Sequence, residues 1–397
     1  MKITAVETLR LGEFPNIIWT IVEDESGHRG LGETFMGAAE VEAWVHSSAA
    51  PLLLGQDAVA VDVIRTRLRP YVGHQAAGVE MRGRSAIDIA LWDLWGHRTA
   101  QPVYRLLGGR MRESVRTYNT CAGYQYIRAA QGQASSNWGL GQGAGPYEDL
   151  EAFLTDAGSL AESLLDQGIS GMKIWPFDRF AEQSNGMAIT PAQLVEGMEP
   201  FAKIRNRVGG RMQIMLECHS LWAAPAARDI AQALAPFNVY WIEDPIQMNG
   251  FAALADLRAR IGIKVTASET LATRHQFADL IRAQAVDIVM LDLSWCGGIT
   301  EAKAIAAIAE ANHLPIAPHD CTGPVVWAAS CHLSVHAPNT LIQESVRAFY
   351  TGWYRELVEG LPQVENGAIS VSDLPGHGMQ LKPGLFKRAD AIHRRSD

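Results

Sequence analysis

Cysteine, positive charge and long apolar runs are scarce in this 397-residue sequence, and each scarcity argues against a class of protein. The five cysteines are an odd number without a CxxC pair, which disfavours a disulfide framework or a cysteine-rich zinc site and predicts reduced thiols in a cytoplasmic protein. With a net charge of −9 and no Lys/Arg-rich run, we expect neither nucleic acid nor a membrane surface as the main partner. No stretch reaches the roughly 18 uncharged apolar residues of a membrane span, and the N-terminal MKITAVETLRLG lacks the apolar core of a signal peptide.

The hydrophobic pattern changes once along the chain and predicts two domains in an α/β fold. Residues 1–114 contain alternating, strand-like segments followed by amphipathic, helix-like ones, so we expect an α+β domain. Residues 115–364 alternate short β-rich runs with helical stretches, which is typical of parallel βαβ units. The turn-rich tail, residues 365–397, is expected to pack back onto the first domain.

Eight β-rich runs between residues 115 and 364 predict a closed (β/α)7β TIM-like barrel. An open doubly wound sheet is the alternative, but no GxGxxG follows the first run. Two long loops, residues 11–38 and 122–148, are either lids over a site or plain surface loops. The eight runs are VRTYNTC, GMKIWP, MQIMLE, VYWIED, KVTASE, DIVMLDL, LPIAPH and LIQES.

Six acid-base residues recur through the second half of the chain at intervals of 23 to 27 residues, about one β/α unit. Each of them closes a β-like run and precedes a helix-like stretch. A parallel barrel brings its strand ends to one mouth, so residues far apart in sequence meet there. The spacing therefore predicts one active site built from Glu217, Glu243, Glu269, Asp292, His319 and Glu344.

Three glutamates at the ends of consecutive strands predict a metal site. Glu217, Glu243 and Glu269 would repel one another at short range unless a cation lay between them. An all-carboxylate set favours a hard divalent ion, and we expect Mg²⁺. Zinc is disfavoured because no Cys/His cluster accompanies the carboxylates, although His219 is two residues from Glu217.

The histidines of the second half are candidate acid-base groups. A carboxylate hydrogen-bonded to one ring nitrogen raises the basicity of the other, so His319 beside Asp292 predicts a general base; a structural histidine is the alternative. If the strand continued past Glu217, His219 would point to the same side as that ligand and place a second acid-base group near the metal.

Two further side chains complete the predicted site. Lys173, on the second run, points to the barrel mouth if that run is extended, where it would hold a substrate carboxylate or stabilise charge; a rim lysine is the alternative. Glu344 would be a proton or hydrogen-bond partner of that carboxylate. Together these groups suit removal of the weakly acidic proton beside a carboxylate, because a divalent metal and nearby donors stabilise the enediolate that results.

The motifs WIEDP (241–245), ASET (267–270), DLSWCGGITEA (292–302), PHD (318–320) and RSAIDIALWDLWG (84–96) resemble the enolase superfamily, in its mandelate racemase subgroup. The resemblance covers nearly the whole chain and implies a capping domain, a barrel and a returning tail. It implies a homo-oligomer, and cap loops around residues 15–38 that close the site and help to select the substrate.

By the same resemblance, Glu217, Glu243 and Glu269 match the magnesium ligands, Asp292 and His319 match the base dyad, and Glu344 matches the electrophilic acid. The racemases carry a Lys-x-Lys pair on the second strand, whereas this chain has Trp175 at the second lysine position. His219 is similar to the histidine that handles the departing hydroxyl in sugar-acid dehydratases of the galactonate and gluconate type. The first ligand is Glu217 where those enzymes more often have Asp.

We therefore expect a Mg²⁺-dependent dehydratase of a sugar acid, a small carboxylate, that yields a 2-keto-3-deoxy acid. A cycloisomerase or epimerase acting on a lactone or anhydro-sugar acid is the alternative enzyme. A metabolite-binding or regulatory barrel without activity is the alternative outside catalysis. Trp175 and Asp320 are expected to contact the substrate.

Overall fold

The N-terminal part of the molecule is an antiparallel sheet covered by helices. The structure, a computed structural model, describes residues 1–71, 77–128, 130–143 and 145–397. The sheet has the order β15-β1-β2-β3 and consists of β1 (Ile3–Leu11), β2 (Ile17–Asp24), β3 (Arg29–Phe35) and, from the other end of the chain, β15 (Ala391–Ser396). Its helices are α1 (Ala38–Trp44), α2 (Ala50–Leu53), α3 (Val61–Arg67), α4 (Val79–Thr99) and α5 (Val103–Leu107).

Helix α4 joins the cap to the barrel. It packs against β3 on one side and contacts α13 (Gly298–Ala311) of the barrel. The approach to β3 is so close that a Cβ at Gly32 would lie 1.9 Å from the carbonyl oxygen of Ala86, so only glycine fits there. This contact fixes the end of β3, which reaches toward the barrel.

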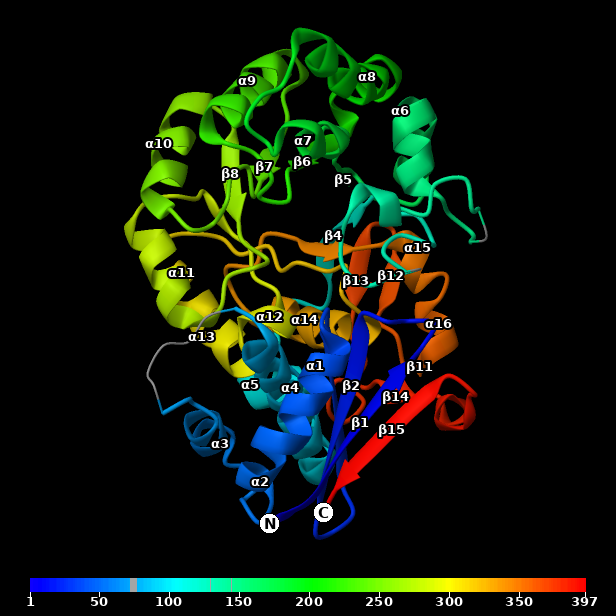
Figure 1. Ribbon diagram of the computed structural model, residues 1–397, viewed down its shortest axis with the longest axis vertical. Helices are drawn as coiled ribbons and strands as arrows, with labels where there is room; N and C mark the ends of the chain where they lie inside the picture. Colours follow the sequence, from blue (N-terminus) through cyan, green and yellow to red (C-terminus); the bar gives the residue numbers. More distant parts are fainter. Residues whose placement is uncertain (72–76, 129, 144) are drawn as a thin grey trace.

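The barrel predicted from the eight runs is present, with the capping domain below it (Figure 1). Parallel pairing runs through β4 (Val115–Thr120), β5 (Gly171–Ile174), β6 (Gln213–Glu217), β7 (Trp241–Glu243), β8 (Lys264–Ala267) and β9 (Ile288–Val289). The seventh run is reduced to Ile316, which bridges Val289 and Thr340. Strand β10 (Gln343–Ser345) then pairs with β4 and closes the barrel.

One long helix follows each of the first seven barrel positions, as a (β/α)7β barrel requires. They are α6 (Asp149–Leu165), α8 (Pro191–Val208), α9 (Ala224–Leu234), α10 (Phe251–Ile261), α11 (Thr273–Arg282), α13 and α14 (Pro324–His336). Short helices lie in the loops: α7 (Asp178–Ser184), α12 (Leu293–Cys296), α15 (Arg347–Tyr350) and α16 (Tyr354–Leu357).

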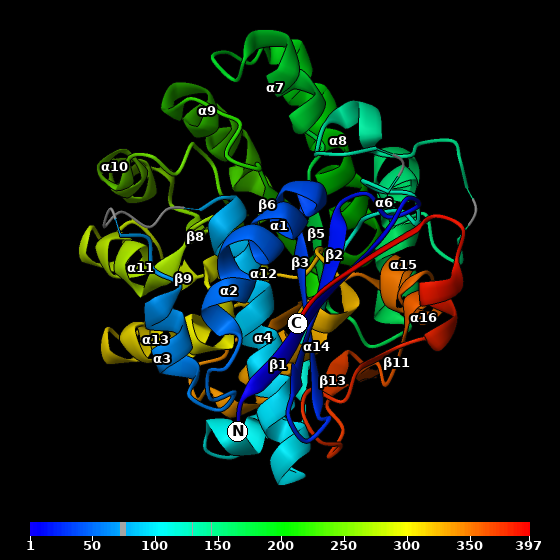
Figure 2. The same cartoon turned by 60° about the horizontal axis from the view of Figure 1, so that its bottom comes forward.

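The C-terminal tail, predicted as one unit, is divided among three sheets. Strand β15 lies along β1 in both views (Figures 1 and 2). The hairpin of β12 (Gln363–Glu365) and β13 (Ala368–Ser370) instead pairs with the first residues of β4, at the end of the barrel away from the site. A third pair joins β11 (Val358–Glu359) to β14 (Gln380–Leu381). In the parts of the chain that the structure describes, no helix is long and apolar enough to cross a membrane.

Candidate active site

A layer of apolar side chains inside the barrel supports the site. The buried inner cluster contains Tyr118, Met215, Trp241, Met290, Ala317 and Ile342. Side chains two residues apart on an extended segment share a face, so the next inward position on each of these segments lies one step nearer the barrel mouth. These next positions are all buried and polar: Thr120, Glu217, Glu243, Asp292, His319 and Glu344. The two-residue period of the strands thus places a layer of polar side chains at the barrel mouth, directly above the apolar layer.

The three predicted metal ligands meet at this layer. Glu217 and Glu243 are paired in register on β6 and β7, and Glu269 follows the end of β8. One carboxylate oxygen from each of the three lies within 4.8 Å of the others, and all three side chains are buried. The three residues thus meet as their spacing predicted, although Glu217 and Glu269 lie 52 positions apart in the sequence.

The chemistry of this cluster fits a divalent cation. Burial and the negative charge of Glu217 raise the pKa of Glu243 well above its ordinary value. Among the described residues, Glu243 Oε2 is buried without a hydrogen-bond donor, and Glu217 Oε2 lies 3.1 Å from the Lys173 ammonium group. A cation between the carboxylates would relieve the repulsion and use those oxygens. Three buried carboxylates at this separation can therefore hold a divalent metal.

Lys173 lies among these carboxylates and Glu344. Its Nζ is 2.7 Å from Glu243 Oε1, 3.1 Å from Glu217 Oε2 and 2.9 Å from Glu344 Oε1. Burial works to lower the pKa of Lys173, but the charges of Glu243 and Glu344 outweigh it and raise the pKa well above its ordinary value. Glu344 also accepts hydrogen bonds from the Thr120 hydroxyl and, at 3.0 Å, from the backbone N–H of Asp320. Lys173 is a buried cation, not a rim lysine.

His319 and Asp292 form a close pair on the opposite side of the cluster. His319 Nδ1 lies 2.7 Å from Asp292 Oδ2, and its Nε2 lies 2.7 Å from Glu269 Oε2. Asp292 accepts further hydrogen bonds from the backbone N–H of Ser294 at 2.6 Å and from the Thr322 hydroxyl at 3.3 Å. With Nδ1 held by Asp292, the nitrogen that faces the metal ligands is Nε2.

His219 reaches the site by a turn. The assumption that the strand continues past Glu217 to His219 is wrong. Strand β6 ends at Glu217, and His219 adopts a left-handed φ of 46°. The turn forms because Glu217 Oε1 accepts hydrogen bonds from the backbone N–H groups of Cys218 (3.0 Å) and His219 (2.7 Å). The imidazole still lies beside the metal ligands.

A second histidine–carboxylate pair was not foreseen from the sequence. His219 Nδ1 lies 2.5 Å from Oδ2 of Asp178, the first residue of α7. Burial lowers the pKa of His219, but the charges of Asp178 and Glu217 outweigh it and raise the pKa to about 9. A single aspartate at the start of a short helix carries no sequence signal, since only the fold brings it to this histidine.

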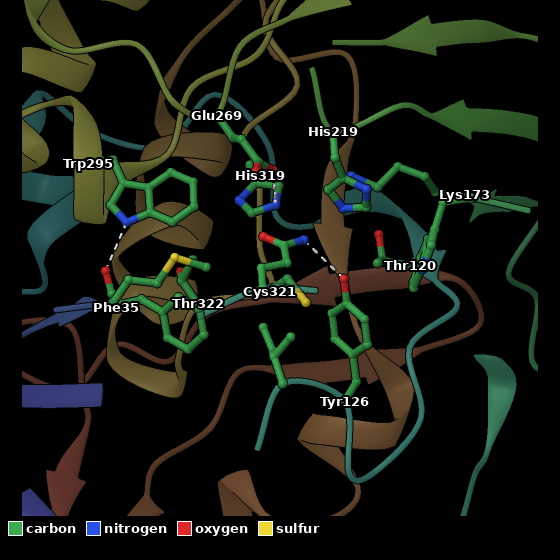
Figure 3. Close-up of a pocket in the computed structure, with 14 residues that line it drawn as sticks. Phe35, Thr120, Tyr126, Lys173, His219, Glu269, Trp295, His319, Cys321 and Thr322 are labelled. Carbon is green, nitrogen blue, oxygen red and sulfur yellow. Dashed lines mark hydrogen bonds and ion pairs between the residues drawn. The ribbon is translucent and has the colours of Figure 1, made fainter. Parts of the chain in front are cut away.

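A small pocket joins the two histidines (Figure 3). Its cavity is about 20 Å³, and its lining includes Lys173, His219, Glu269 and His319. The other side is formed by the end of β3 and by the 122–148 insert, of which residues 129 and 144 lie outside the described residues. A volume of this size holds about one water molecule, so a sugar acid needs more room than the pocket has in this structure.

The two predicted substrate contacts differ in position. Trp175 lines the pocket and meets the His219 ring edge-on, with centroids 5.8 Å apart. Asp320 does not line it: the side chain is buried beside the Tyr354 hydroxyl, 3.3 Å from Oδ1. Sequence reasoning did not single out Tyr126, Gln133, Trp295 or Thr322, which line the pocket from the insert and from the segments around the base dyad.

Comparison with known families agrees with this architecture. Residues 156–385 match the family model described as enolase C-terminal domain-like, and residues 13–108 match the N-terminal domain of mandelate racemase / muconate lactonizing enzyme. The first match spans the barrel from α6 onward together with most of the tail. The second spans most of the capping domain.

Relatives cover the chain almost end to end. A protein of Ralstonia pickettii named D-galactonate dehydratase is 28% identical over 97% of this chain and 93% of its own, and a protein of Saccharolobus solfataricus named arabinonate dehydratase is 26% identical over 95% and 91%. A crystal structure of an enolase of the mandelate racemase subgroup from Agrobacterium tumefaciens is 46% identical, covers 100% of this chain and 99% of its own, and has a TM-score of 0.89. The chain therefore belongs to the enolase superfamily, in its mandelate racemase subgroup.

Proposed function

We propose that this enzyme is a Mg²⁺-dependent dehydratase of a hydroxylated sugar acid. The observation that carries the proposal is the pocket itself: two histidines, each with a carboxylate against Nδ1, line one cavity beside a three-glutamate cluster. Dehydration needs one group to take a proton from carbon and another to give a proton to the departing hydroxyl. The names of the relatives from Ralstonia pickettii and Saccharolobus solfataricus support this reaction type.

The charged groups would receive the substrate carboxylate. Glu217, Glu243 and Glu269 would hold the Mg²⁺, which supplies positive charge next to a carboxylate that becomes more negative during the reaction. The ammonium group of Lys173 adds a second fixed positive charge in the same buried layer. Glu344, held by Thr120 and the backbone of Asp320, offers a proton or hydrogen bond to the carboxylate.

Proton abstraction falls to His319. Asp292 fixes the Nδ1–H tautomer, and with Glu269 turned from His319 Nε2 to the Mg²⁺, the lone pair on Nε2 would take the C2 proton of the acid. The electron pair of the broken C–H bond moves into the enediolate, where the cations of the site stabilise it.

Loss of water falls to His219. With Nδ1 against Asp178, its Nε2 is the nitrogen available to protonate the C3 hydroxyl. As the C–O bond breaks, the enediolate electrons form the C2–C3 double bond and the hydroxyl leaves as water. The resulting enol tautomerises to a 2-keto-3-deoxy acid.

The direct test is a panel of aldonic and aldaric acids with Mg²⁺ and semicarbazide detection of 2-keto products. We expect keto product from at least one acid, its loss with a chelator, and its return with added Mg²⁺. The His319→Asn variant is the negative control. No keto product from any acid at several Mg²⁺ concentrations would overturn the proposal.

The second candidate is a cycloisomerase or epimerase acting on a lactone or anhydro-sugar acid. It is favoured by the same two dyads, because they provide an acid-base group on each side of the pocket. Proton NMR of the product in D₂O separates the candidates, because an isomer keeps all the atoms of the substrate, whereas a dehydration product lacks one water.

A further inference from the structure

The pocket wall opposite the charged groups is largely apolar. Besides the reacting groups, the pocket is lined by Phe35, Met36, Ile127, Trp175, Trp295 and Cys321. Trp295 Nε1 already donates to the carbonyl oxygen of Phe35 at 3.1 Å, so it offers a substrate only its ring (Figure 3). A hydroxyl buried against such a wall loses its hydrogen bonds to water without replacement.

Two of the remaining polar side chains are already engaged. The hydroxyl of Thr120 donates to Glu344, and that of Thr322 donates to Asp292. Both hydroxyl protons are therefore already donated to carboxylates of the site. Neither is free to donate to a hydroxyl on the part of the substrate remote from its carboxylate.

Tyr126 and Gln133, both from the insert, are differently placed. The Tyr126 hydroxyl accepts a hydrogen bond from Gln133 Nε2 at 3.1 Å, and it points into the pocket beneath the histidines (Figure 3). Among the described residues, nothing accepts the proton of this hydroxyl and nothing donates to Gln133 Oε1. Tyr126 is buried and Gln133 lies at the exposed rim, so the pair presents one donor and one acceptor across the mouth. Trp175 adds a buried indole N–H without an acceptor among the described residues.

The cap holds this part of the insert in place. Asn16 Nδ2 donates to the carbonyl oxygens of Ile127 (2.9 Å) and Ala130 (3.0 Å), and Asn16 Oδ1 accepts from the backbone N–H of Gly132 (3.0 Å). Asn137 donates to the carbonyls of Ala130 and Gly132 from the other side. Ile127, Ala130 and Gly132, described residues next to Tyr126 and Gln133, are thus held by the cap and by Asn137, as a site that discriminates between ligands requires.

We infer that Tyr126 and Gln133 determine substrate specificity by binding one hydroxyl on the part of the acid remote from its carboxylate. The apolar wall then disfavours further hydroxyls, apart from one placed against the indole N–H of Trp175, so the preferred substrates are short acids or acids deoxygenated at the far end. This inference rests on the proposed function and narrows its substrate class. A hydroxyl buried against the apolar wall should lower kcat/KM by about 10- to 100-fold. An acid that lacks the hydroxyl bound by Tyr126 and Gln133 leaves these two side chains without that hydrogen-bond partner.

The test compares each aldonic acid that is turned over with its terminally deoxygenated counterpart, for example galactonate with 6-deoxygalactonate. We expect the deoxy acid to have at least about tenfold higher kcat/KM. The Tyr126→Phe variant should lose about 10-fold or more on acids that carry the recognised hydroxyl and much less on acids that lack it. Gln133→Leu changes a residue at the exposed rim and should produce the same difference in kcat/KM between acids with and without the recognised hydroxyl. It replaces Tyr126→Phe in the test if that variant folds poorly.

The matched control is Tyr124→Phe. Tyr124 belongs to the same insert, but its hydroxyl contacts Glu356 on the exposed surface and does not line the pocket. We expect this variant to keep the wild-type ratio. Equal kcat/KM for each pair of acids, or equal losses in Tyr126→Phe and Gln133→Leu on acids with and without the recognised hydroxyl, would overturn the inference.

Binding data separate this inference from the proposed reaction. Dissociation constants for the same pairs are measured by calorimetry with Mg²⁺ present, in wild-type protein and in the three variants. A deoxy preference in the wild type, together with weaker binding of acids that carry the recognised hydroxyl in Tyr126→Phe or Gln133→Leu but no keto product from any acid, would retain the specificity role and overturn only the dehydration. Keto product without any preference for the deoxy acids would retain the dehydration and overturn the specificity role.

Discussion

The two histidine–carboxylate pairs of the pocket are built in different ways. His319 and Asp292 stand on neighbouring segments of the barrel, and Asp292 is itself held by the backbone and hydroxyl of Ser294 and by Thr322. The ring of Trp295 stacks against His319 with centroids 6.1 Å apart. Each member of this pair therefore has several contacts that fix its orientation.

The pair of His219 and Asp178 has fewer supports. It joins the turn after β6 to the first residue of the short helix α7, and Asp178 Oδ1 has no hydrogen-bond partner among the described residues. Burial raises the pKa of Asp178 to about 6, although the charge of His219 opposes the shift. The comparison teaches that the base is held by several contacts in the barrel, whereas the acid is oriented by one carboxylate, Asp178, and by the edge-on ring of Trp175.

Replacing the two histidines in turn gives the largest expected effects. His319→Asn should lower both C2 hydrogen exchange in D₂O and keto-acid formation by at least about 10³-fold, because no other group is placed to take the proton. His219→Asn should lower keto-acid formation to a similar extent yet retain C2 exchange. Exchange is followed by NMR and keto acid with semicarbazide. Loss of exchange in both variants would show that the roles are assigned wrongly.

Asp292→Asn tests the support of the base. An amide cannot stabilise the imidazolium and favours the wrong tautomer, so we expect a loss of about 10²- to 10³-fold in C2 exchange and in turnover. The matched control is Asp279→Asn, which alters an exposed aspartate on α11 that pairs with Arg282. Equal activity of Asp292→Asn and the control would remove Asp292 from the mechanism.

The sequence predicted those parts of the site that the strand period determines. Glu217, Glu243 and His319 lie two residues beyond inner-layer side chains, so a local pattern is enough to place them at the mouth. The same pattern predicted eight strands, although the seventh is only a bridge at Ile316.

Residues whose position depends on loops were not predictable. Asp178 begins a short helix, and Tyr126 belongs to an insert that Asn16 fixes from the other domain, so contacts distant in sequence decide where both side chains lie. Asp320 follows the base in sequence, yet its side chain lies beside the Tyr354 hydroxyl instead of the pocket. Sequence periodicity carries no information about such turns.

Asp178→Asn sharpens the comparison between the two pairs. Since Asp178 orients His219 and does not touch the C2 proton, we expect keto-acid formation to fall by about 10- to 100-fold while C2 exchange stays close to wild type. The ratio of exchange to elimination is the readout, because a general loss of structure would lower both rates together. Asp178→Glu should restore part of the elimination rate. An unchanged ratio in Asp178→Asn would show that His219 does not need this carboxylate.

A third buried histidine shows what happens without a carboxylate and gives the smallest expected effect. Among the described residues no carboxylate lies within hydrogen-bond distance of His332, whose Nδ1 accepts from the backbone N–H of Tyr104 at 3.3 Å. Burial, aided by the charge of His377, lowers the pKa of His332 from 6.5 to about 3. Between these pH values the unfolded chain binds a proton that the folded protein does not, so this residue makes the free energy of unfolding decrease as the pH falls.

His332→Asn keeps an acceptor for the Tyr104 N–H and removes the titration. Its free energy of unfolding should therefore fall less steeply below pH 6.5, by about 1.4 kcal/mol less for each pH unit. Urea unfolding at pH 7, 6 and 5 measures the slope, with the exposed His313→Asn as the control that should keep the wild-type slope. At pH 5 the difference amounts to about 2 kcal/mol. Parallel slopes in wild type and His332→Asn would mean that His332 is protonated in the folded protein, and that a buried histidine here needs no carboxylate to hold its charge.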